Sequence, residues 1–510
     1  MTERAAYIQM EGICKTFGVV QANDHINFSV EKGEIHALLG ENGSGKSTLM
    51  NMLSGIYMPD SGSIIIGGKP CHFHSPKDAI LSGIGMVHQH FKLVDILTAK
   101  ENITAGMPGS FFIKNKGMTA DIDKIAAKYG LQVQADRKIY NMSVGEKQTV
   151  EILKVLYRGA DLLILDEPTA VLTPQETAAL FNILRNMRRE GCAIIIITHK
   201  LNEVLEISDR VTVLRKGQCI GTVNTAETNA KALTEMMVGR PISLEIQRPF
   251  VESGSEIKPM LDVQNLTIEN QEKIKVINNV SFQVRSGEIL GVAGIAGSGQ
   301  KELCEGIVGL QKVSGKVIFK GEDLAGCTPG TIINKGISMS FIPEDRLGMG
   351  LVGGLDIVDN VLLKSYRRTK GLFVDRKQGE IMAQGIVKRF DISTPGIHHQ
   401  VSKLSGGNIQ KVLLGREVSL DPSVIITAYP TRGLDIGASY HIYDVLNEEK
   451  KKGVGILYIG EDLDVLMELC DRIMVIHQGE IMDILPAAEA TKEQLGLLML
   501  GHREEGAYHA

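Results

Sequence analysis

The sequence predicts an α/β protein with two copies of one module, each a mainly parallel sheet covered by helices on both faces. Short, nearly continuous apolar runs alternate with longer segments of helical spacing, and this alternation is typical of parallel sheets. Segments of the first half recur in the second half 254 to 262 residues later. A chain of 510 residues is long enough for two to four domains, each with its own core.

Two pairs of segments define the repeat. FSVEKGEI at 28–35 corresponds to FQVRSGEI at 282–289, an offset of 254 residues. DRVTVLRKG at 209–217 corresponds to DRIMVIHQG at 471–479, an offset of 262, so the second copy gains eight residues in its middle. Because the stretch between the copies is rich in Pro, Ser and charge, we expect a linker there. The predicted boundaries are 1–243 for the first module, 244–258 for the linker and 259–510 for the second module.

Each module is expected to contain several buried strands, each followed by a helix. The apolar runs that predict strands in the first module are GEIHALLG at 33–40, DLLILDEP at 161–168 and CAIIIITH at 192–199. Helical spacing follows these runs at 49–55, 173–190 and 200–208. The order of strand and helix favours right-handed crossovers that cover both faces of the sheet.

The composition excludes several classes of protein. Apolar residues at 43% and charged residues at 23% are typical of a folded globular chain. A formal charge of −5 disfavours a protein that coats nucleic acid. The seven cysteines include no CxxC pair, so we expect neither a zinc site nor a disulfide framework, and a reducing compartment is favoured. No apolar run reaches the roughly 18 residues of a membrane span, so no transmembrane segment is expected.

A phosphate-binding loop follows the first predicted strand. The sequence GENGSGKST matches GxxxxGK[ST] and comprises Gly40, Glu41, Asn42, Gly43, Ser44, Gly45, Lys46, Ser47 and Thr48. Its glycines allow successive backbone N–H groups to surround a phosphate at a helix N-terminus. Lys46 is expected to reach the β- and γ-phosphates, and Ser47 to ligate Mg²⁺.

Two carboxylates and a histidine follow the next predicted strands. Asp166 and Glu167 end the run LLILDE, and alone this pair would indicate an ordinary solvated turn. Beside a phosphate-binding loop, Asp166 is expected to hold Mg²⁺ through water and Glu167 to act as the general base for the attacking water. His199 ends another strand, where a side chain that senses the γ-phosphate would project.

The ordered motifs resemble those of ATP-binding cassette (ABC) ATPases over nearly the whole chain. They are GENGSGKST, VHQHF, MSVGE, LLILDEPTAVLT and IIITH in the first half, with LSGGNIQK at 404–411 in the second half, which resembles the ABC signature. The resemblance implies two tandem P-loop NTPase domains, each with a helical subdomain and a smaller antiparallel β region. It also implies ATP and Mg²⁺ as cofactors, Phe17 as the aromatic that stacks on adenine, and Gln89 as the residue that links Mg²⁺ to the transporter.

In this family each nucleotide site joins the P-loop of one module to the signature of the other, which implies one complete and one degenerate site. The first P-loop would be completed by Ser405, Gly406 and Gly407 of the second signature.

The second P-loop keeps Gly294, Gly297 and Gly299 but has Gln300 where Lys46 stands and Lys301 where Ser47 stands. At the repeat offsets, Asp166, Glu167, His199 and Gln89 become Ala428, Tyr429, Glu461 and Glu344. The opposing signature, MSVGE, has Val144 in place of a glycine. We expect hydrolysis at the first site and weak binding or no turnover at the second.

Three classes of function fit two fused cassettes. The first is a transport engine bound to separate integral membrane permease subunits, on the cytoplasmic face of the cell membrane as a peripheral protein. The second is a soluble tandem ABC protein that acts on ribosomes or nucleic acid. The third is a nucleotide-sensing scaffold without catalysis. A short linker and a degenerate second site favour transport, and the complete first set disfavours the scaffold.

The motifs also resemble one branch of the importers more than another. PEDR at 343–346, PTRGLD at 430–435 and GED at 460–462 are similar to those of importer ATPases for monosaccharides and nucleosides. VHQHFKLV at 87–94 and DEPTAVLTPQE at 166–176 resemble the nucleoside branch, which a substrate-binding lipoprotein serves. A nucleoside importer is therefore the preferred interpretation, and a monosaccharide importer is the alternative.

Overall fold

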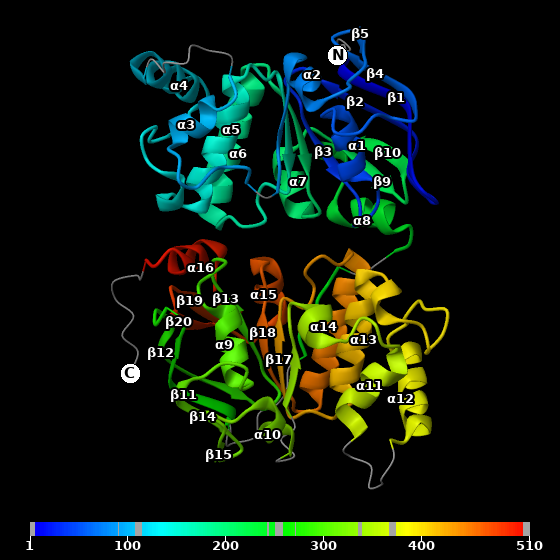
Figure 1. Ribbon diagram of the computed structural model, residues 1–510, viewed down its shortest axis with the longest axis vertical. Coiled ribbons are helices and arrows are strands. Elements are labelled where there is room, and N and C mark those ends of the chain that lie inside the picture. Colours follow the sequence, from blue (N-terminus) through cyan, green and yellow to red (C-terminus); the bar gives the residue numbers. More distant parts are fainter. Residues whose placement is uncertain are drawn as a thin grey trace. The chain divides into compact units, whose positions relative to one another are not determined.

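The computed structural model describes residues 6–89, 91–107, 115–241, 244–249, 259–270, 272–334, 339–366 and 374–502. The chain divides into two compact units, Met1–Ser243 and Leu244–Ala510 (Figure 1). Each unit contains one six-stranded sheet and one four-stranded sheet. The expected α/β architecture with a separate antiparallel region is confirmed in both units.

The six-stranded sheet of the first unit has the order β10-β9-β3-β8-β7-β6. All neighbouring strands are parallel except β10, which pairs antiparallel with β9. The bounds are Ile35–Leu39 for β3, Ile84–Val87 for β6, Leu162–Asp166 for β7, Ala193–Ile197 for β8, Arg210–Arg215 for β9 and Gln218–Asn224 for β10. Because β3, β8 and β7 are parallel neighbours, the segments that follow them emerge at one edge of the sheet.

The four-stranded sheet of the first unit is antiparallel and has the order β2-β1-β4-β5. Its bounds are Ala6–Phe17 for β1, Val20–Glu31 for β2, Ser61–Ile66 for β4 and Lys69–Cys71 for β5. The helices of this unit are α1 (Lys46–Leu53), α2 (Pro76–Leu81), α3 (Ala99–Thr104), α4 (Asn115–Tyr129), α5 (Val144–Tyr157), α6 (Pro174–Arg189), α7 (Leu201–Ile207) and α8 (Ala230–Val238). In Figure 1, α3, α4 and α5 lie together, apart from β1 and β2.

Two hydrophobic cores cover the faces of the parallel sheet in the first unit. Alternate residues of a strand point to opposite faces, and Leu163 and Ile194 accordingly pack among α3 to α6. Ile164 and Ile195 pack on the other face, against α1 and the antiparallel sheet. The strands are therefore apolar at successive positions, which explains the continuous runs in the sequence.

The second unit repeats this topology, with sheet orders β16-β17-β18-β13-β19-β20 and β12-β11-β14-β15. Its strands are β11 (Pro259–Glu269), β12 (Lys275–Arg285), β13 (Ile289–Ala293), β14 (Ser314–Phe319), β15 (Glu322–Asp323), β16 (Met339–Ile342), β17 (Val424–Ala428), β18 (Gly455–Ile459), β19 (Arg472–His477) and β20 (Glu480–Pro486). Its helices are α9 (Gln300–Ile307), α10 (Pro329–Asn334), α11 (Ile357–Ser365), α12 (Arg376–Arg389), α13 (Gly406–Val418), α14 (Ile436–Lys451), α15 (Leu463–Leu469) and α16 (Lys492–Met499).

One part of the extra length in the second unit lies directly after β16. There a single turn of π-helix, η3, spans Arg346–Gly350, and Asp345 caps it by accepting a hydrogen bond from Gly348 N at 2.8 Å. π-turns are rare and occur often at functional sites. This one contains the last residue of the PEDR motif, Arg346.

Residues 244–249, which the sequence analysis assigned to the linker, belong to the second unit. Asn447 Nδ2 donates to the carbonyl of Gln247 at 3.2 Å, and Arg248 donates to the carbonyl of Cys470. Ile246 packs against the core of that unit. The remainder of the expected linker, 250–258, lies outside the described residues.

A buried carboxylate, Glu417 on α13, is expected to contribute strongly to stability. It is fully buried, and its oxygens lie 2.7 Å from Lys364 Nζ and 2.8 Å from Arg416 Nη2. Burial acts most strongly on its pKa and would raise it, but these two cations together lower the pKa below its ordinary value. We expect Glu417→Ala to lower the free energy of unfolding by about 3 kcal/mol in urea denaturation of the full chain.

Because the pKa of Glu417 is lower in the folded state, its stabilisation is complete above the ordinary glutamate value and is lost as the pH falls through the lowered pKa. The control is Glu206→Ala, which removes an exposed pair with Arg185 and should cost less than about 1 kcal/mol. Equal losses in the two variants would contradict the assignment.

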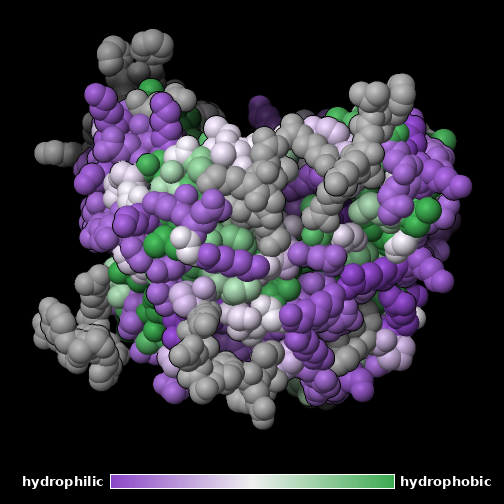
Figure 2. All heavy atoms as spheres, turned by 90° about the horizontal axis from the view of Figure 1, so that it is seen from below, coloured by the Kyte–Doolittle hydropathy of each residue, from purple (hydrophilic) through white to green (hydrophobic). Residues whose placement is uncertain are grey.

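Among the described residues, no helix is both long and apolar enough to cross a membrane. Figure 2 shows one face on which hydrophilic residues predominate and apolar residues occur in small groups between them.

Candidate nucleotide site

The first P-loop runs from the end of β3 into α1, as the motif predicted. Gly45 precedes the helix with φ 100°, and Gly43 has φ 79°, both in the left-handed region that favours glycine. A Cβ on Gly40 would lie 2.3 Å from Ser44 Oγ and 2.4 Å from the carbonyl of Leu214, so only glycine fits there. Asn23 Nδ2 supports the loop by donating to Gly45 O at 3.2 Å.

Lys46 lies folded back into the loop. Its Nζ donates to the carbonyls of Gly40 at 2.6 Å and Glu41 at 2.9 Å, and the residue is 7% exposed. Burial lowers the pKa of this ammonium group, against the opposing pull of Glu167 and Asp166. The ammonium group therefore lies inside the loop beside two carboxylates.

Asp166 is the last residue of β7 and Glu167 follows it, and β8 lies between β7 and β3, the strand that leads into the P-loop. Burial raises the pKa of Asp166, with the charge of Glu167 as the second cause. Burial also acts most strongly on Glu167 and would raise its pKa, but the hydrogen bond and charge of His199, with Lys46, outweigh it and lower the pKa. The two neighbouring carboxylates therefore have pKa values shifted in opposite directions, an arrangement typical of functional sites.

Glu167 joins the two other predicted catalytic residues. Its Oε1 lies 2.9 Å from His199 Nδ1, and its Oε2 accepts a hydrogen bond from Gln89 Nε2 at 3.4 Å. The backbone of Glu167 is left-handed, with φ 46°, which is uncommon for a residue with a side chain. Its N–H donates to Ile197 O at 2.8 Å, so β8 fixes the turn that presents the carboxylate. The structure thus brings Gln89, Glu167 and His199 together.

Phe17 ends β1 and is exposed. Its ring packs edge-on against Tyr57, which follows α1, with centroids 5.3 Å apart. Phe17 is 44% exposed and Tyr57 is 38% exposed, so an aromatic surface remains available for stacking. The sequence motifs indicate Phe17 but not its partner Tyr57, because the two are separated by the whole P-loop segment.

The P-loop residues fit a bound nucleotide and a magnesium ion. Ser44 is buried, and within the described residues its Oγ has no hydrogen-bond partner. Gly43 faces open space, as a loop that receives a phosphate requires. Ser47 lies in the first turn of α1 and is exposed to solvent. Hydroxyl and carboxylate oxygens are ligands that Mg²⁺ prefers.

The second P-loop has the same backbone with different side chains. Gly299 precedes α9 with φ 101° and Gly297 has φ 88°, matching Gly45 and Gly43. Gln300 is buried, and its Nε2 donates to Ile295 O at 3.1 Å, so a neutral amide takes the place of Lys46. Lys301 lies on the exposed side of α9, 3.8 Å from Glu305 Oε1 and 57% exposed.

The strand ends of the second unit hold a different charge network. Tyr429 takes the position of Glu167, with φ 50° and its N–H donating to Ile459 O at 2.9 Å. Ala428 is buried at the position of Asp166. Arg432 pairs with Glu344 and, through Nε at 3.1 Å, with Glu461. An arginine therefore joins the residues that correspond to Gln89 and His199.

The two signature segments differ at the N-termini of their helices. Ser405 caps α13, and Asn408 Nδ2 donates to its Oγ at 2.9 Å. Ser143 caps α5, but Glu146 accepts a hydrogen bond from its backbone N–H at 2.7 Å. A carboxylate thus already occupies the N-terminus of α5, whereas that of α13 carries no acid in its first turn. The N-terminus of α13 is therefore the more favourable of the two for a phosphate.

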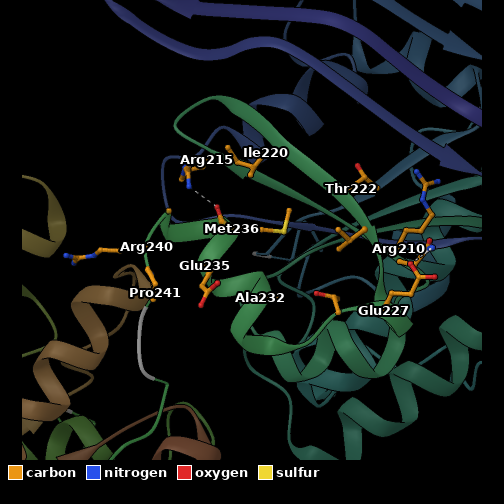
Figure 3. A pocket seen from close by; sticks show the side chains of 14 residues that line it. Arg210, Arg215, Ile220, Thr222, Glu227, Ala232, Glu235, Met236, Arg240 and Pro241 are labelled. Atoms are coloured by element: carbon orange, nitrogen blue, oxygen red, sulfur yellow. Dashed lines mark hydrogen bonds between the residues drawn. The ribbon is translucent and has the colours of Figure 1, made fainter.

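A groove of about 820 Å³ lies on the first unit beside β10 and α8, and none of the predicted site residues lines it (Figure 3). Arg215 Nη1 donates to Met236 O at 3.3 Å, and Arg210 lies 3.4 Å from Glu34 Oε2. Contacts of the fold engage these two of the three arginines that line the groove, the third being Arg240, and we assign no ligand to it.

Cys14, Asp24 and His25 bring three potential metal ligands within 4.8 Å of one another. The backbone N–H of His25 donates to Cys14 Sγ at 3.2 Å. In the second unit the N–H of Asn279 donates to Thr267 Oγ1 at 3.0 Å. The second unit thus forms the same hairpin with a hydroxyl in place of the thiol. The turn itself therefore explains why Cys14, Asp24 and His25 lie close together.

Comparison with known proteins adds independent findings. The ABC transporter family profile matches residues 23–170 and 277–432. The guanosine import ATP-binding protein NupO of Bacillus subtilis is 44% identical over 98% of this chain and 98% of its own length. The nucleoside import ATP-binding protein NupA of Lactococcus lactis is 42% identical over 97% and 98%. The glucose import ATP-binding protein TsgD13 of Haloferax volcanii is 41% identical over 98% and 96%.

Among solved structures, the complex of archaeal ribosomal stalk protein aP1 and archaeal ribosome recycling factor aABCE1 matches 93% of this chain and 90% of that chain. The TM-score is 0.60 at 17% identity, which shows a shared fold of two cassettes and no more.

Proposed function

Because this chain belongs to the ABC transporter ATPases and hydrolyses ATP to drive transport, we propose that it powers nucleoside import through separate membrane permease subunits. The permeases, a substrate-binding lipoprotein and a peripheral position on the cytoplasmic face of the membrane are parts of this proposal. The family match and the import ATP-binding relatives support it.

In the proposed first site, the P-loop, the aromatic ring and the strand-end residues have different roles. Lys46 and the P-loop N–H groups hold the β- and γ-phosphates, and Phe17 stacks on adenine. Ser47, Gln89 and Asp166 would hold Mg²⁺, which neutralises phosphate charge when bound.

The chemistry of the proposed first site rests on Glu167. It accepts a proton from the attacking water while His199 and Gln89 hold its carboxylate in place. The observation that carries the proposal is the contact of both side chains with Glu167. Ser405, Gly406 and Gly407 are proposed to contact the γ-phosphate of ATP, where helix N–H groups stabilise transition-state charge.

The second site is proposed to bind nucleotide weakly or without turnover. Its P-loop holds a neutral amide, Gln300, in the position of the ammonium group. Tyr429 cannot act as a base, because burial raises the pKa of its hydroxyl far above neutrality. One turnover site for each chain follows.

Nucleoside is the proposed cargo because the import ATP-binding proteins for guanosine and nucleosides are 44% and 42% identical to this chain. The glucose and xylose import ATP-binding proteins are 41% and 39% identical. This order agrees with the motifs VHQHFKLV and DEPTAVLTPQE.

Uptake measurements test the cargo. Cells from which the gene has been deleted should lose uptake of radiolabelled guanosine or cytidine and keep uptake of ribose, xylose and glucose. The wild-type chain should restore nucleoside uptake, and a chain with Lys46→Ala should not. Loss of uptake of a sugar alone would assign the chain to the monosaccharide importers instead.

A further inference from the structure

Two residues at the start of α7 contact the turn that follows Glu167. Thr169 lies in this turn and is almost fully buried, and its hydroxyl donates to Glu203 Oε2 at 2.5 Å. Lys200 Nζ donates to the carbonyl of Thr169 at 3.2 Å and lies 3.1 Å from Glu203 Oε1. One ion pair therefore holds the turn at a side chain and at the backbone.

These contacts close a ring that includes the proposed general base. Glu167 stands two residues before Thr169, and its carboxylate contacts His199. Lys200 directly follows His199 in the chain. The turn after β7 and the segment after β8 are thus connected twice, once through Glu167 with His199 and once through Thr169 with Lys200 and Glu203. A shift of either segment would disturb both connections.

Lys200 and Glu203 do not serve the start of their own helix. Lys200 is the N-cap residue of α7, a position that favours side-chain acceptors and where a cation opposes the helix dipole. Glu203 occupies the third position, where a glutamate often accepts the N-cap N–H in a capping box. Here that N–H donates to Thr198 Oγ1 at 3.0 Å instead. In α3, α5 and α6 of the same unit, the glutamate at the third position does close a capping box.

The corresponding helix of the second unit begins in the ordinary way. Asp462 stands at the position of Lys200 and caps α15 by accepting a hydrogen bond from Asp464 N at 2.9 Å. Val465 stands at the position of Glu203 and packs against the hydrophobic core. The first unit therefore gives up a favourable helix start for contacts with the turn, and a departure from local preference of this kind is typical of functional sites.

The threonine of the turn is retained in the second unit but is held from another direction. Thr431 stands at the position of Thr169, and Tyr443 Oη donates to its Oγ1 at 3.4 Å. Tyr443 is buried on α14, and Phe181, which has no hydroxyl, takes its place on α6. Both units support the turn, but only the unit that carries Glu167 does so with an ion pair that also reaches the backbone.

We infer that Lys200 and Glu203 are positioning residues for the general base Glu167. They fix the turn at Thr169 and thereby the direction in which the carboxylate faces the attacking water. The inference rests on the proposed role of Glu167 and concerns residues of the first unit alone. A partly exposed ion pair contributes little to stability, whereas displacement of a reacting group by about an ångström lowers the rate about a hundredfold. Substitutions here should therefore change kcat more than stability.

The first test is ATPase kinetics and thermal unfolding of the full chain with Lys200→Ser. Serine is a good N-cap residue, so the melting temperature without ATP should stay unchanged or rise although the contact with Thr169 is lost. We expect kcat to fall about tenfold, with KM for ATP within twofold of wild type. Lys200→Arg keeps a cation that reaches the same partners and should retain at least about half of kcat.

The second test uses the other member of the pair. Glu203→Val introduces the residue of the second unit and should lower kcat about as much as Lys200→Ser. The double variant should resemble the single ones, because both residues act through Thr169. Lys452→Ser is the matched control. Lys452 lies 2.6 Å from Glu449 Oε1 in a lysine–glutamate pair of the same three-residue spacing at the end of α14, and its loss should leave kcat within twofold.

The outcomes separate this inference from the proposed function. A kcat within twofold of wild type in Lys200→Ser overturns the inference, as does an equal loss in Lys200→Arg. A loss of kcat with a lowered melting temperature in Lys200→Ser indicates a structural role and also overturns it. If Glu203→Val does not fold, the two Lys200 variants decide. Full activity of Glu167→Gln would refute the proposed function itself, whereas its loss beside a fully active Lys200→Ser refutes the inference alone.

Discussion

Glu167→Gln is expected to lower kcat for ATP hydrolysis at least about a hundredfold while ATP still binds. The amide has nearly the shape of the carboxylate but cannot accept a proton from water. Its contacts with His199 and Gln89 and the left-handed turn at the end of β7 are otherwise retained. Single-turnover hydrolysis together with equilibrium binding of ATP separates loss of chemistry from loss of affinity.

The corresponding residue of the other unit supplies the control. Tyr429→Phe removes a hydroxyl at the position of Glu167 and keeps the ring beside Arg432. Activity within about twofold of wild type is expected, because no base is removed. A loss of less than tenfold in Glu167→Gln would show that another group activates the water.

Lys46→Ala is expected to abolish hydrolysis, because it weakens ATP binding and slows the chemical step. Together these losses should lower kcat/KM about a hundredfold or more. The ammonium group lies within the loop, between the carbonyls of Gly40 and Glu41, at the place where phosphate charge accumulates. Measurement of ATP binding by isothermal titration, with ATPase rates, checks both parts.

Lys301→Ala is the matched control in the second P-loop. This lysine is 57% exposed and lies near Glu305 on the outer side of α9 rather than in the loop. Most of the ATPase activity should therefore remain. Equal losses in Lys46→Ala and Lys301→Ala would show that both P-loops support turnover and would contradict the asymmetric assignment.

Much of the candidate site followed from local sequence because its residues stand directly after buried strands. Gly40, Asp166 and His199 follow continuous apolar runs. Such runs indicate strands that are buried on both faces of the sheet. Parallel neighbours then bring these positions to one edge. The repeat offsets likewise located Gln300, Tyr429 and Glu461, because both units fold with the same strand order.

Side-chain partners were less accessible to the same reasoning. Tyr57 beside Phe17 and Asn23 beneath Gly45 belong to segments far apart in the sequence, and no periodicity links them. The sequence alone does not say whether Lys301, next to the position of Lys46, reaches a phosphate. The structure has Lys301 on the outer side of α9 and Gln300 inside the loop. A shift of one residue along a helix turns a side chain by about 100°, and this rotation decides which of two neighbours faces a ligand.

The sequence by itself determined the duplicated α/β fold, the P-loop and the carboxylates at the end of β7, because strand patterns and phosphate chemistry are local. Only the tertiary structure decided that Glu167 joins Gln89 and His199, and that Arg432 joins Glu344 and Glu461 with opposite charge. Contacts between strand ends depend on the order of strands in the sheet and on side-chain rotamers. Strand order and rotamers are set by the packing of the whole unit, so no local pattern in the sequence predicts these contacts.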